Sequence, residues 1–377
     1  MTVDTTAAAA VPTFRALPAG LDTPRLVVDV ARVRANIGRL QGELDRRGIA
    51  LRPHAKTHKS VAVARMQLEA GARGITVGTL GEAEVFAAAG IGDLFLAYPT
   101  WADGPKAARL RALHEALPDF RVGVDSVRGA ERLGAAASGA GSGRRLRVLV
   151  EVDPGLHRTG AASPEAAVEV ARAARAAGLA VEGVFAHGGH SYRPGAAAST
   201  GADEVRTLAA AADALRAAGF DIETISAGST PTMLTAAAGP VTEIRAGTYI
   251  YGDRQQVVLG SMPPEGCAVA VATTVVSAFE DRLVLDAGAK TLTKDRAAFL
   301  TGHGAIAGYP DLVIDRVNDY HGMVTVRPDA ARPMLGDVVA VVPNHICPVV
   351  DLFDEALAIE ADGSTSRWAV DARGRSG

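Results

Sequence analysis

The chain has 377 residues, more than most single hydrophobic cores contain, so its length predicts two domains or one large barrel with an appendage. Its composition, 48% hydrophobic and 21% charged, is that of a typical globular protein. A net charge of -3 and an aromatic content of 5% argue against nucleic acid or an anionic membrane as a partner.

The N-terminal residues, 1–22, are expected to form a tail, because they lack the basic start and the apolar run of a signal peptide. No apolar run in the sequence reaches the length of a membrane span. The two cysteines, Cys267 and Cys347, suggest no disulfide framework, so a reducing compartment is the default. These features predict a cytoplasmic protein.

Eight short β-branched runs, separated by Ala-rich helical segments, occupy the middle of the chain. The expected strands are Ala50–His54, Gly74–Val77, Leu94–Ala97, Arg121–Val124, Arg147–Val152, Val181–Ala186, Glu223–Ala227 and Thr242–Arg245. Helices are expected at Val30–Arg47 before them and, for example, at Ser60–Ala70, Leu80–Ala89, Pro105–Ala116, Pro164–Ala177 and Asp203–Ala218. Alternating strands and helices pair the strands in parallel, and eight units over roughly 200–250 residues match a (β/α)8 TIM-like barrel. An open doubly wound sheet is the alternative, but it seldom runs to eight evenly spaced units.

The alternation of strands and helices ends at about Gly260, after which strands follow one another without helices of comparable length. The expected strands are Ala268–Phe279, Arg282–Asp286, Gly322–Val326 and Val338–Pro343. A turn-rich stretch at Ser261–Gly266 marks the boundary. We therefore expect a barrel over 23–262 and a mainly β domain over 263–377.

The segment Arg52–Lys59, with the sequence RPHAKTHK, directly follows the first expected strand. The carboxyl ends of barrel strands are where such proteins carry their chemistry. At a barrel mouth, Lys56 is expected to be partly desolvated, which makes its amine a usable nucleophile. Taken alone, a solvated basic turn with two incidental histidines explains the segment at least as well.

Two glycine-rich turns favour the functional interpretation of the Arg52–Lys59 segment. Ser226–Thr232 follows the seventh expected strand, and Ala246–Tyr249 follows the eighth. Both offer backbone N–H groups and hydroxyls to a phosphate, and the loops after strands seven and eight are the common phosphate site of this barrel. Ordinary Gly/Ser turns are frequent, but two of them at these strands, with Lys56 at strand one, indicate a phosphate site.

Two further polar turns follow the fifth and sixth strands. Asp153–Gly160 can aim Arg158 at a planar ring or at a carboxylate, and His187–Tyr192 has two glycines that permit a planar ligand to approach closely. A metal bound by His187 and His190 is the alternative for the second turn. The glycines are explained equally well by a loop that faces a cofactor.

The mainly β domain contains one more candidate, Pro343–Pro348. On a strand, His345 and Cys347 point to the same face, and an imidazole beside a thiolate suits Zn²⁺ with two positions left for water or substrate. A buried structural cysteine is the alternative, because a His-x-Cys pair is common by chance.

Taken together, these residues resemble the D-serine dehydratase and D-threonine aldolase family, which shares the alanine-racemase-like barrel of fold-type III pyridoxal-phosphate enzymes. The resemblance runs from about Thr23 to Phe353. The segments that carry it are Thr23-Pro24, Arg52–Lys59, Ser229–Thr232, Asp286–Gly288, His321-Gly322 and His345–Cys347. It implies an α/β protein with a barrel and a mainly β C-terminal domain, and pyridoxal 5'-phosphate as the cofactor.

The resemblance also implies roles for the selected residues. Lys56 is similar to the Schiff-base lysine, His58 and Arg158 are further catalytic candidates, and Tyr192 resembles the tyrosine that meets the pyridine nitrogen. The residues implied as cofactor contacts are Lys56, His54, Arg158, His187, Tyr192, Ser229, Thr230, Gly247, Thr248 and Tyr249. Among these, the phosphate cradle is Ser229, Thr230, Gly247 and Thr248.

His345 and Cys347 match the metal pair of the dehydratase branch, whereas the aldolase branch tends to carry an aspartate at the second position. Cys347 therefore favours a zinc-dependent dehydratase, with manganese or magnesium as alternative metals. The resemblance implies a small-molecule D-3-hydroxy amino acid as substrate, a β-elimination with Lys56 as the base, and a 2-oxo acid and ammonia as products. If His58 or His190 deprotonates the 3-hydroxyl instead, aldol cleavage to glycine and an aldehyde follows.

Family members often carry acidic residues just before the His321-Gly322 pair, whereas this chain has Tyr320 there. The sequence therefore leaves D-serine, D-threonine and 3-hydroxyaspartate open as substrates. An amino-acid racemase, a non-catalytic pyridoxal-phosphate carrier and a metal-storage or structural role are the competing interpretations. A homodimer is expected, because two-domain proteins of this fold usually form head-to-tail dimers.

Overall fold

The computed structural model describes residues 12–141 and 143–377. The chain divides into two compact units, which we call the barrel unit and the β unit. The barrel unit consists of Arg39–Lys56, Val63–Gly247 and Gly374–Gly377. The β unit consists of the described residues up to Gly38, with Thr57–Ala62 and Thr248–Arg373. Helix α1 (Val30–Arg46) belongs to both, because the division falls within it.

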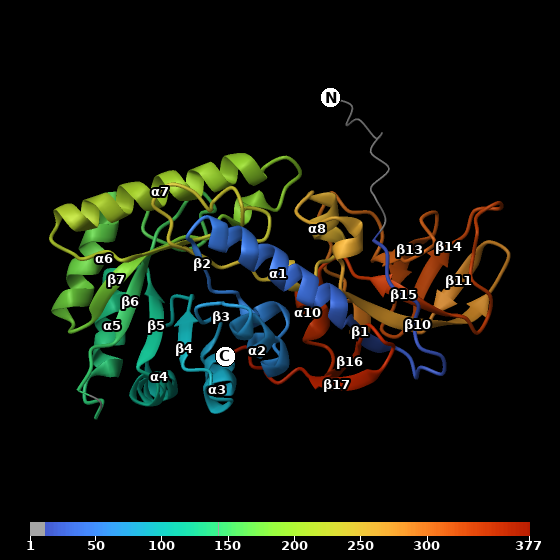
Figure 1. Cartoon of the computed structure of the whole chain (residues 1–377), viewed down its shortest axis with the longest axis horizontal. Helices are drawn as coiled ribbons and strands as arrows, with labels where there is room; N and C mark the ends of the chain where they lie inside the picture. Colours follow the sequence, from blue (N-terminus) through green and yellow to red (C-terminus); the bar gives the residue numbers. More distant parts are fainter. Residues whose placement is uncertain (1–11, 142) are drawn as a thin grey trace. The chain divides into compact units, whose positions relative to one another are not determined.

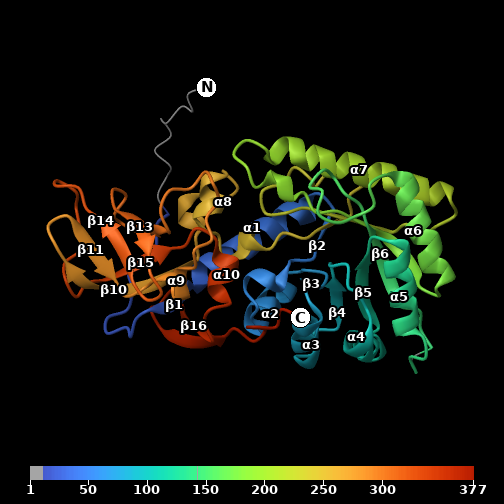
Figure 2. The same ribbon diagram turned by 180° about the vertical axis from the view of Figure 1, so that it is seen from behind.

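The barrel unit is built on eight parallel strands, in the order β2-β9-β8-β7-β6-β5-β4-β3 (Figure 1, and from behind in Figure 2). Their bounds are β2 Ala50–Leu51, β3 Ile75–Val77, β4 Asp93–Leu96, β5 Asp119–Val124, β6 Arg147–Glu151, β7 Ala180–Phe185, β8 Thr224–Ala227 and β9 Glu243–Ile244. The two outer strands, β2 and β3, are joined by a parallel bridge between His54 and Thr76. Two backbone bonds of 2.8 Å, Thr76 N to Pro53 O and Arg73 N to Leu51 O, extend that bridge. The predicted TIM-like barrel is therefore confirmed.

Helices follow the strands and lie side by side, α4 against α5, α5 against α6 and α6 against α7. Their bounds are α2 Val61–Glu69, α3 Leu80–Ala88, α4 Gly104–Ala116, α5 Val127–Ala137, α6 Pro164–Ala176 and α7 Ala197–Ala217. Helix α7 begins at Ala197 rather than at the expected Asp203. Ser126 and Ser163 cap α5 and α6, since their hydroxyls accept the N–H of Gly129 and Ala166 at 3.2 Å each. No helix in the described part of the chain is long and apolar enough to cross a membrane.

A network of charged side chains connects several of the barrel strands. Arg52, only 1% exposed, donates to Glu243 at 2.6 Å and to Asp93 at 2.5 Å. Arg121 donates to Asp93 at 2.6 Å and to Glu182 at 3.1 Å. Each of these two arginines thus joins two carboxylates that lie on different strands, and ion pairs hold these strands together.

Replacing Arg52 by alanine is expected to lower the free energy of unfolding by about 3–5 kcal/mol, because Glu243 loses its buried partner. Chemical denaturation of the purified protein measures this loss. The matched control is Arg216→Ala, which removes the exposed pair with Asp213 and is expected to cost less than about 1 kcal/mol. Equal stabilities of the two variants would contradict a structural role for the network.

The β unit contains a nine-stranded sheet in the order β11-β14-β13-β12-β15-β10-β1-β16-β17. The strand bounds are β1 Arg25–Asp29, β10 Val269–Ala278, β11 Arg282–Leu285, β12 Ala305–Ile306, β13 Val313–Val317, β14 Gly322–Thr325, β15 Val338–Val342, β16 Glu355–Ile359 and β17 Thr365–Ala369. Its short helices are η3 Thr248–Ile250, α8 Arg254–Val258, η4 Pro264–Gly266, α9 Ala289–Leu292 and α10 Ile346–Val350. The expected C-terminal β sheet is present and has more strands than the sequence indicated.

Strand β1 lies in the sheet of the β unit, although the sequence analysis assigned residues 23–262 to the barrel. It pairs antiparallel with β10 and parallel with β16. The pairing is driven by burial, since Val27 packs in one apolar cluster with Cys267, Ala270 and Ile359. The N-terminal strand is thus part of the second sheet, and the domain boundaries drawn from sequence stay predictions.

Candidate active site

Lys56 lies just beyond the carboxyl end of β2, in the short helix η1 (Ala55–Thr57). Its backbone N–H donates to Nδ1 of the half-buried His54 at 3.3 Å. The side chain of Lys56 is exposed, whereas the sequence analysis expected partial desolvation. The reason is that Lys56 lies in the turn after the strand and not within it.

Positive side chains gather around His187, which follows β7. Burial lowers the pKa of His187 well below its usual value, and the charges of Lys56, Arg158 and Arg245 lower it further. The structure therefore brings together residues from the ends of four barrel strands, β2, β6, β7 and β9. Cations beside an imidazole are surroundings that attract an anionic ligand, and the role of these residues as cofactor contacts stays a prediction.

Arg245 was not selected from the sequence. It is 5% exposed and donates through Nε to Ser226 Oγ at 2.8 Å and through Nη2 to the Ala186 carbonyl. Its guanidinium lies 5.2 Å from the ring centre of Phe185. Burial lowers the pKa of Arg245, and the nearby carboxylate of Glu243 opposes that effect. Its burial holds this cation in a fixed position, a property that appears only when the barrel closes.

The loops after β7 and β8 are tied together by Glu204, a buried residue of α7 that the sequence analysis also missed. One carboxylate oxygen accepts the N–H of Gly188 at 2.9 Å and of Gly228 at 3.0 Å. The other accepts the Thr232 hydroxyl at 2.6 Å. Burial raises the pKa of Glu204, against these three hydrogen bonds, which lower it. The predicted phosphate turn is thereby held in one conformation.

Ser229 and Thr230 lie in that turn, and both are buried. The Ser229 hydroxyl is 3.0 Å from Thr232 Oγ1 and 3.1 Å from Ser191 Oγ. Gly247 ends the barrel unit, whereas Thr248 and Tyr249, both buried, begin η3 of the β unit. The four-residue phosphate cradle stays a prediction.

Glu204→Ala is expected to lower the free energy of unfolding by about 1–3 kcal/mol, because two backbone N–H groups and a hydroxyl lose their buried acceptor. The affinity for pyridoxal phosphate is expected to fall with it. Denaturation of the cofactor-free protein and a cofactor titration measure the two effects. Glu204→Gln keeps an acceptor oxygen and is the matched control. Equal losses of stability and of cofactor affinity in both variants would show that the hydrogen bonds to the Glu204 carboxylate are unimportant.

The remaining predicted residues of the barrel unit lie after β6 and β7. Arg158 is exposed, and Tyr192 is half-buried at the end of η2 (Gly189–Ser191). His190 Nε2 lies 3.5 Å from Asp203 Oδ2, and its Nδ1 is buried without a partner among the described residues. These side chains present the polar groups that the turns were predicted to offer.

His58, a predicted catalytic residue, belongs to the β unit and is fully buried. Its Nδ1 accepts the N–H of Ser60 at 3.1 Å, and its ring lies edge-on to Tyr251 with ring centres 6.4 Å apart. These contacts are those of a packed side chain. A catalytic role for His58 stays a prediction.

His345 and Cys347 lie at the start of helix α10, with His345 as its N-cap residue. The prediction that they share one face of a strand is wrong, because a helix begins at Ile346. The Ile346 N–H donates to the Asp253 carboxylate at 3.0 Å, which stabilises this helix start. The two side chains nevertheless meet in a hydrogen bond. Burial alone lowers the pKa of His345, but the charge of Cys347, its hydrogen bond, Asp253 and Asp295 together raise that pKa to about 10.

The donor set of this pair fits a divalent cation. The negative charges of a thiolate and two carboxylates favour a proton on the imidazole. A metal ion would replace that proton, because the same negative charges attract a cation. Cys347 Sγ also lies 3.2 Å from Thr57 Oγ1 and 3.7 Å from Thr248 Oγ1. Within residues 12–141 and 143–377 no group of three or more His, Cys, Asp or Glu side chains forms a complete metal site. The metal role of His345 and Cys347 stays a prediction.

Comparison with known families matches residues 28–255 to the alanine racemase N-terminal domain and residues 268–359 to the putative serine dehydratase domain. The chain is 36% identical to a D-threo-3-hydroxyaspartate dehydratase from Delftia sp. (strain HT23), over 92% of this chain and 97% of that protein. It is 34% identical to a D-threonine aldolase from Arthrobacter sp, over 94% of both.

Solved structures agree with these relatives. The dehydratase from Delftia sp. HT23 superposes with a TM-score of 0.84 at 34% identity, over 93% of this chain and 97% of that one. A cysteine-to-alanine mutant of a D-threo-3-hydroxyaspartate dehydratase, described as metal-free, gives 0.86 at the same identity and the same coverage of both chains. An alanine racemase from Bacillus anthracis gives 0.68 at 16% identity, over 93% and 99%, a likeness of fold alone.

Proposed function

Because this chain belongs to the fold-type III pyridoxal-phosphate family that joins an alanine racemase N-terminal domain to a serine dehydratase domain, we propose that it is a metal-dependent dehydratase of D-3-hydroxy amino acids. Membership of the lyase class follows from relatives that are dehydratases and aldolases. The observation that carries the dehydratase proposal is the hydrogen-bonded pair of His345 and Cys347 at the start of α10.

The residues of the barrel unit suit pyridoxal phosphate. Lys56 would hold its aldehyde carbon, and Ser229 and Thr230 would bind the phosphate through hydroxyls that a buried loop already fixes. The cations Arg158 and Arg245 would balance the negative charge of the cofactor or of a substrate carboxylate. When bound, the cofactor supplies an electron sink that stabilises negative charge at the substrate α-carbon.

The chain's own groups then have separate tasks. The freed amine of Lys56 is the base that removes the α-proton, and its exposed position lets it reach a bound substrate. His345 Nε2 and Cys347 Sγ would hold a divalent cation, with zinc favoured by the thiolate. Such an ion supplies Lewis acidity at the 3-hydroxyl, which is otherwise a poor leaving group. The products are a 2-oxo acid and ammonia.

Aldol cleavage to glycine and an aldehyde is the second candidate. His190 is the residue that favours it, because its ring carries a buried Nδ1 without a partner among the described residues and can accept a proton from a 3-hydroxyl. A racemase has no use for the pair of His345 and Cys347, and a non-catalytic cofactor carrier has no use for a β unit that carries such a pair. We further propose a homodimer, which light scattering on the purified protein can test.

One experiment separates these reactions. The purified protein, supplied with pyridoxal phosphate and zinc, is incubated with D-serine, D-threonine and D-3-hydroxyaspartate, and ammonia, 2-oxo acid and glycine are assayed together. A dehydratase gives ammonia and 2-oxo acid in equal amounts and no glycine. If glycine is the main product, the dehydratase proposal is wrong and the protein is an aldolase. If the protein interconverts alanine enantiomers and has no lyase activity, it is a racemase.

A further inference from the structure

Asp295 was not selected from the sequence, yet its Oδ2 lies 2.6 Å from Nδ1 of His345. Both side chains are partly exposed, Asp295 by 51% and His345 by 33%. We propose that Asp295 is a positioning residue, which orients the His345 ring so that Nε2 is presented to a divalent cation. This proposal rests on the metal role of His345 proposed above and adds a residue to it.

The two nitrogens of the His345 ring have different roles. A neutral imidazole carries one proton, and the nitrogen without it is the one that can bind a metal. A carboxylate beside Nδ1 accepts a hydrogen bond from the N–H there, which keeps the proton on Nδ1 and leaves the lone pair on Nε2. Asp295 therefore selects both the tautomer and the rotation of the ring.

The backbone around the ring is already fixed by another carboxylate. Asp253, fully buried, accepts the N–H of Gln256 at 2.8 Å and the N–H of Ile346 at 3.0 Å. Ile346 is the residue between His345 and Cys347. The remaining freedom of His345 is rotation of its side chain, and Asp295 restricts that rotation.

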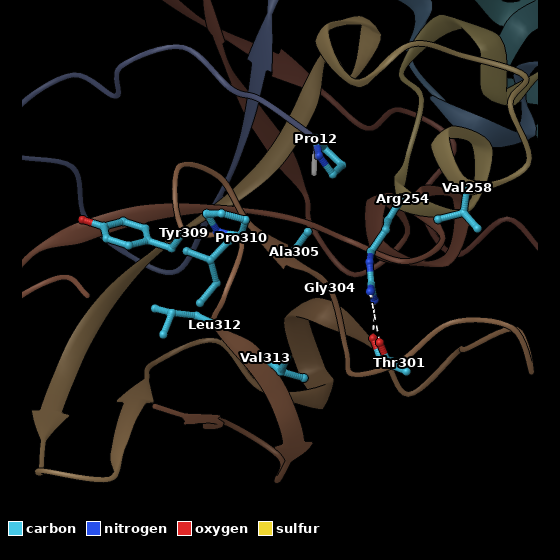
Figure 3. A pocket seen from close by; sticks show the side chains of 11 residues that line it. Pro12, Arg254, Val258, Thr301, Gly304, Ala305, Tyr309, Pro310, Leu312 and Val313 are labelled. Carbon is cyan, nitrogen blue, oxygen red and sulfur yellow. Dashed lines mark hydrogen bonds between the residues drawn. The ribbon is translucent and has the colours of Figure 1, made fainter. Parts of the chain in front are cut away.

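The segment that carries Asp295 is itself anchored next to the pair. Its N–H donates to Thr293 Oγ1 at 3.1 Å. Further along, Arg254 donates to the Thr301 carbonyl and to Asn344 Oδ1, the latter at 3.1 Å. Figure 3 shows Arg254 and Thr301 joined by dashed lines at the edge of a cavity of about 150 Å³. Asn344 directly precedes His345, so the Thr301 end of this segment is connected to the residue next to the pair.

Cys347 is oriented from other elements. Its Sγ lies 3.2 Å from the hydroxyl of Thr57 and 3.7 Å from that of Thr248. Neither threonine has a hydrogen bond to the His345 ring among those that the structure gives. Loss of Asp295 is therefore expected to affect the histidine ligand and to leave the two threonine contacts of the cysteine intact.

The test measures metal affinity without turnover. Zinc binding to metal-stripped holoenzyme is titrated against a chromophoric chelator, and Co²⁺ spectra report the ligand geometry. Asp295→Ala is expected to weaken zinc binding about 10–100-fold and to change the Co²⁺ spectrum. Asp295→Asn keeps an oxygen acceptor and is expected to lose only a few-fold. Asp311→Asn, which alters the exposed pair with Arg327 in the same unit, is the matched control and should bind zinc normally.

Thermal unfolding of the metal-free variants separates positioning from folding. Because Asp295 is half-exposed, its alanine variant should unfold at the wild-type temperature without metal. Normal zinc affinity of Asp295→Ala, together with weak binding by His345→Ala, would overturn the positioning role and leave the proposed function intact. Normal affinity of His345→Ala itself would overturn the metal role in the proposed function.

Discussion

A Lys56→Ala variant is expected to lose the near-visible absorbance of lysine-bound pyridoxal phosphate and at least about 10³-fold of the lyase activity. Alanine has no amine to hold the cofactor covalently and no base to remove the α-proton. The absorbance and the rate should therefore fall together. Spectra of the purified variant, recorded with added cofactor, and the ammonia assay measure both.

The substitution gives a clear result because Lys56 is exposed and its truncation opens no cavity in the core. The backbone bond to His54 Nδ1 survives the change. Lys106→Ala, at an exposed lysine of α4 in the same unit, is the control and should keep the full absorbance band. A Lys56→Ala protein that retains the band at wild-type intensity contradicts the assignment.

The barrel could be predicted because its signals are local. Each short β-branched run, its turn and the helix that follows lie within a few tens of residues, and repetition of the unit specifies the architecture. The partner of β1 could not be predicted. Leu26 pairs with Val271, and such a distant pairing is decided by which apolar surfaces the folded chain buries together.

The candidate site residues also divide into those that local signals predicted and those that depend on tertiary contacts. Lys56, Arg158 and His187 were predicted because they follow barrel strands, and the carboxyl ends of such strands share one end of the barrel. Arg245 and Glu204 were missed because their importance comes from burial and from partners on other elements. Sequence alone shows one more arginine at a strand end and one more glutamate in a helix.

The error at His345 has a specific cause. The run from Ile346 to Val350 is rich in β-branched residues, which favour strands. The tertiary contact from Asp253 to the Ile346 N–H overrides that preference and begins a helical turn. The sequence predicted that His345 and Cys347 lie together, although the predicted backbone geometry was wrong. Two residues separated by one position can meet on one face of a strand, and they can also meet at the start of a helix.

Removal of the divalent cation is expected to lower the dehydratase rate by about 10²–10³-fold, and added zinc should restore it. Lewis acidity at a leaving hydroxyl contributes several kcal/mol to the transition state, and every 1.4 kcal/mol corresponds to about tenfold in rate. Dialysis against a chelator, followed by metal analysis and the ammonia assay, measures the loss. Absorbance of the bound cofactor should not change, because Lys56 does not depend on the metal.

Cys347→Ala is expected to reproduce the chelated state and to resist rescue by zinc, because a single imidazole binds the ion weakly. Cys347→Asp exchanges a soft ligand for a hard one, so the metal that restores activity should shift from zinc toward manganese or magnesium. The control is Cys267→Ala, which removes the other thiol, buried in the apolar cluster of Val27 and Ile359, and should leave the metal dependence unchanged. Full activity of a chelator-treated, metal-free sample would refute the metal role of His345 and Cys347. The same result would remove the reason to favour a dehydratase over an aldolase, since that preference rests on the thiolate ligand.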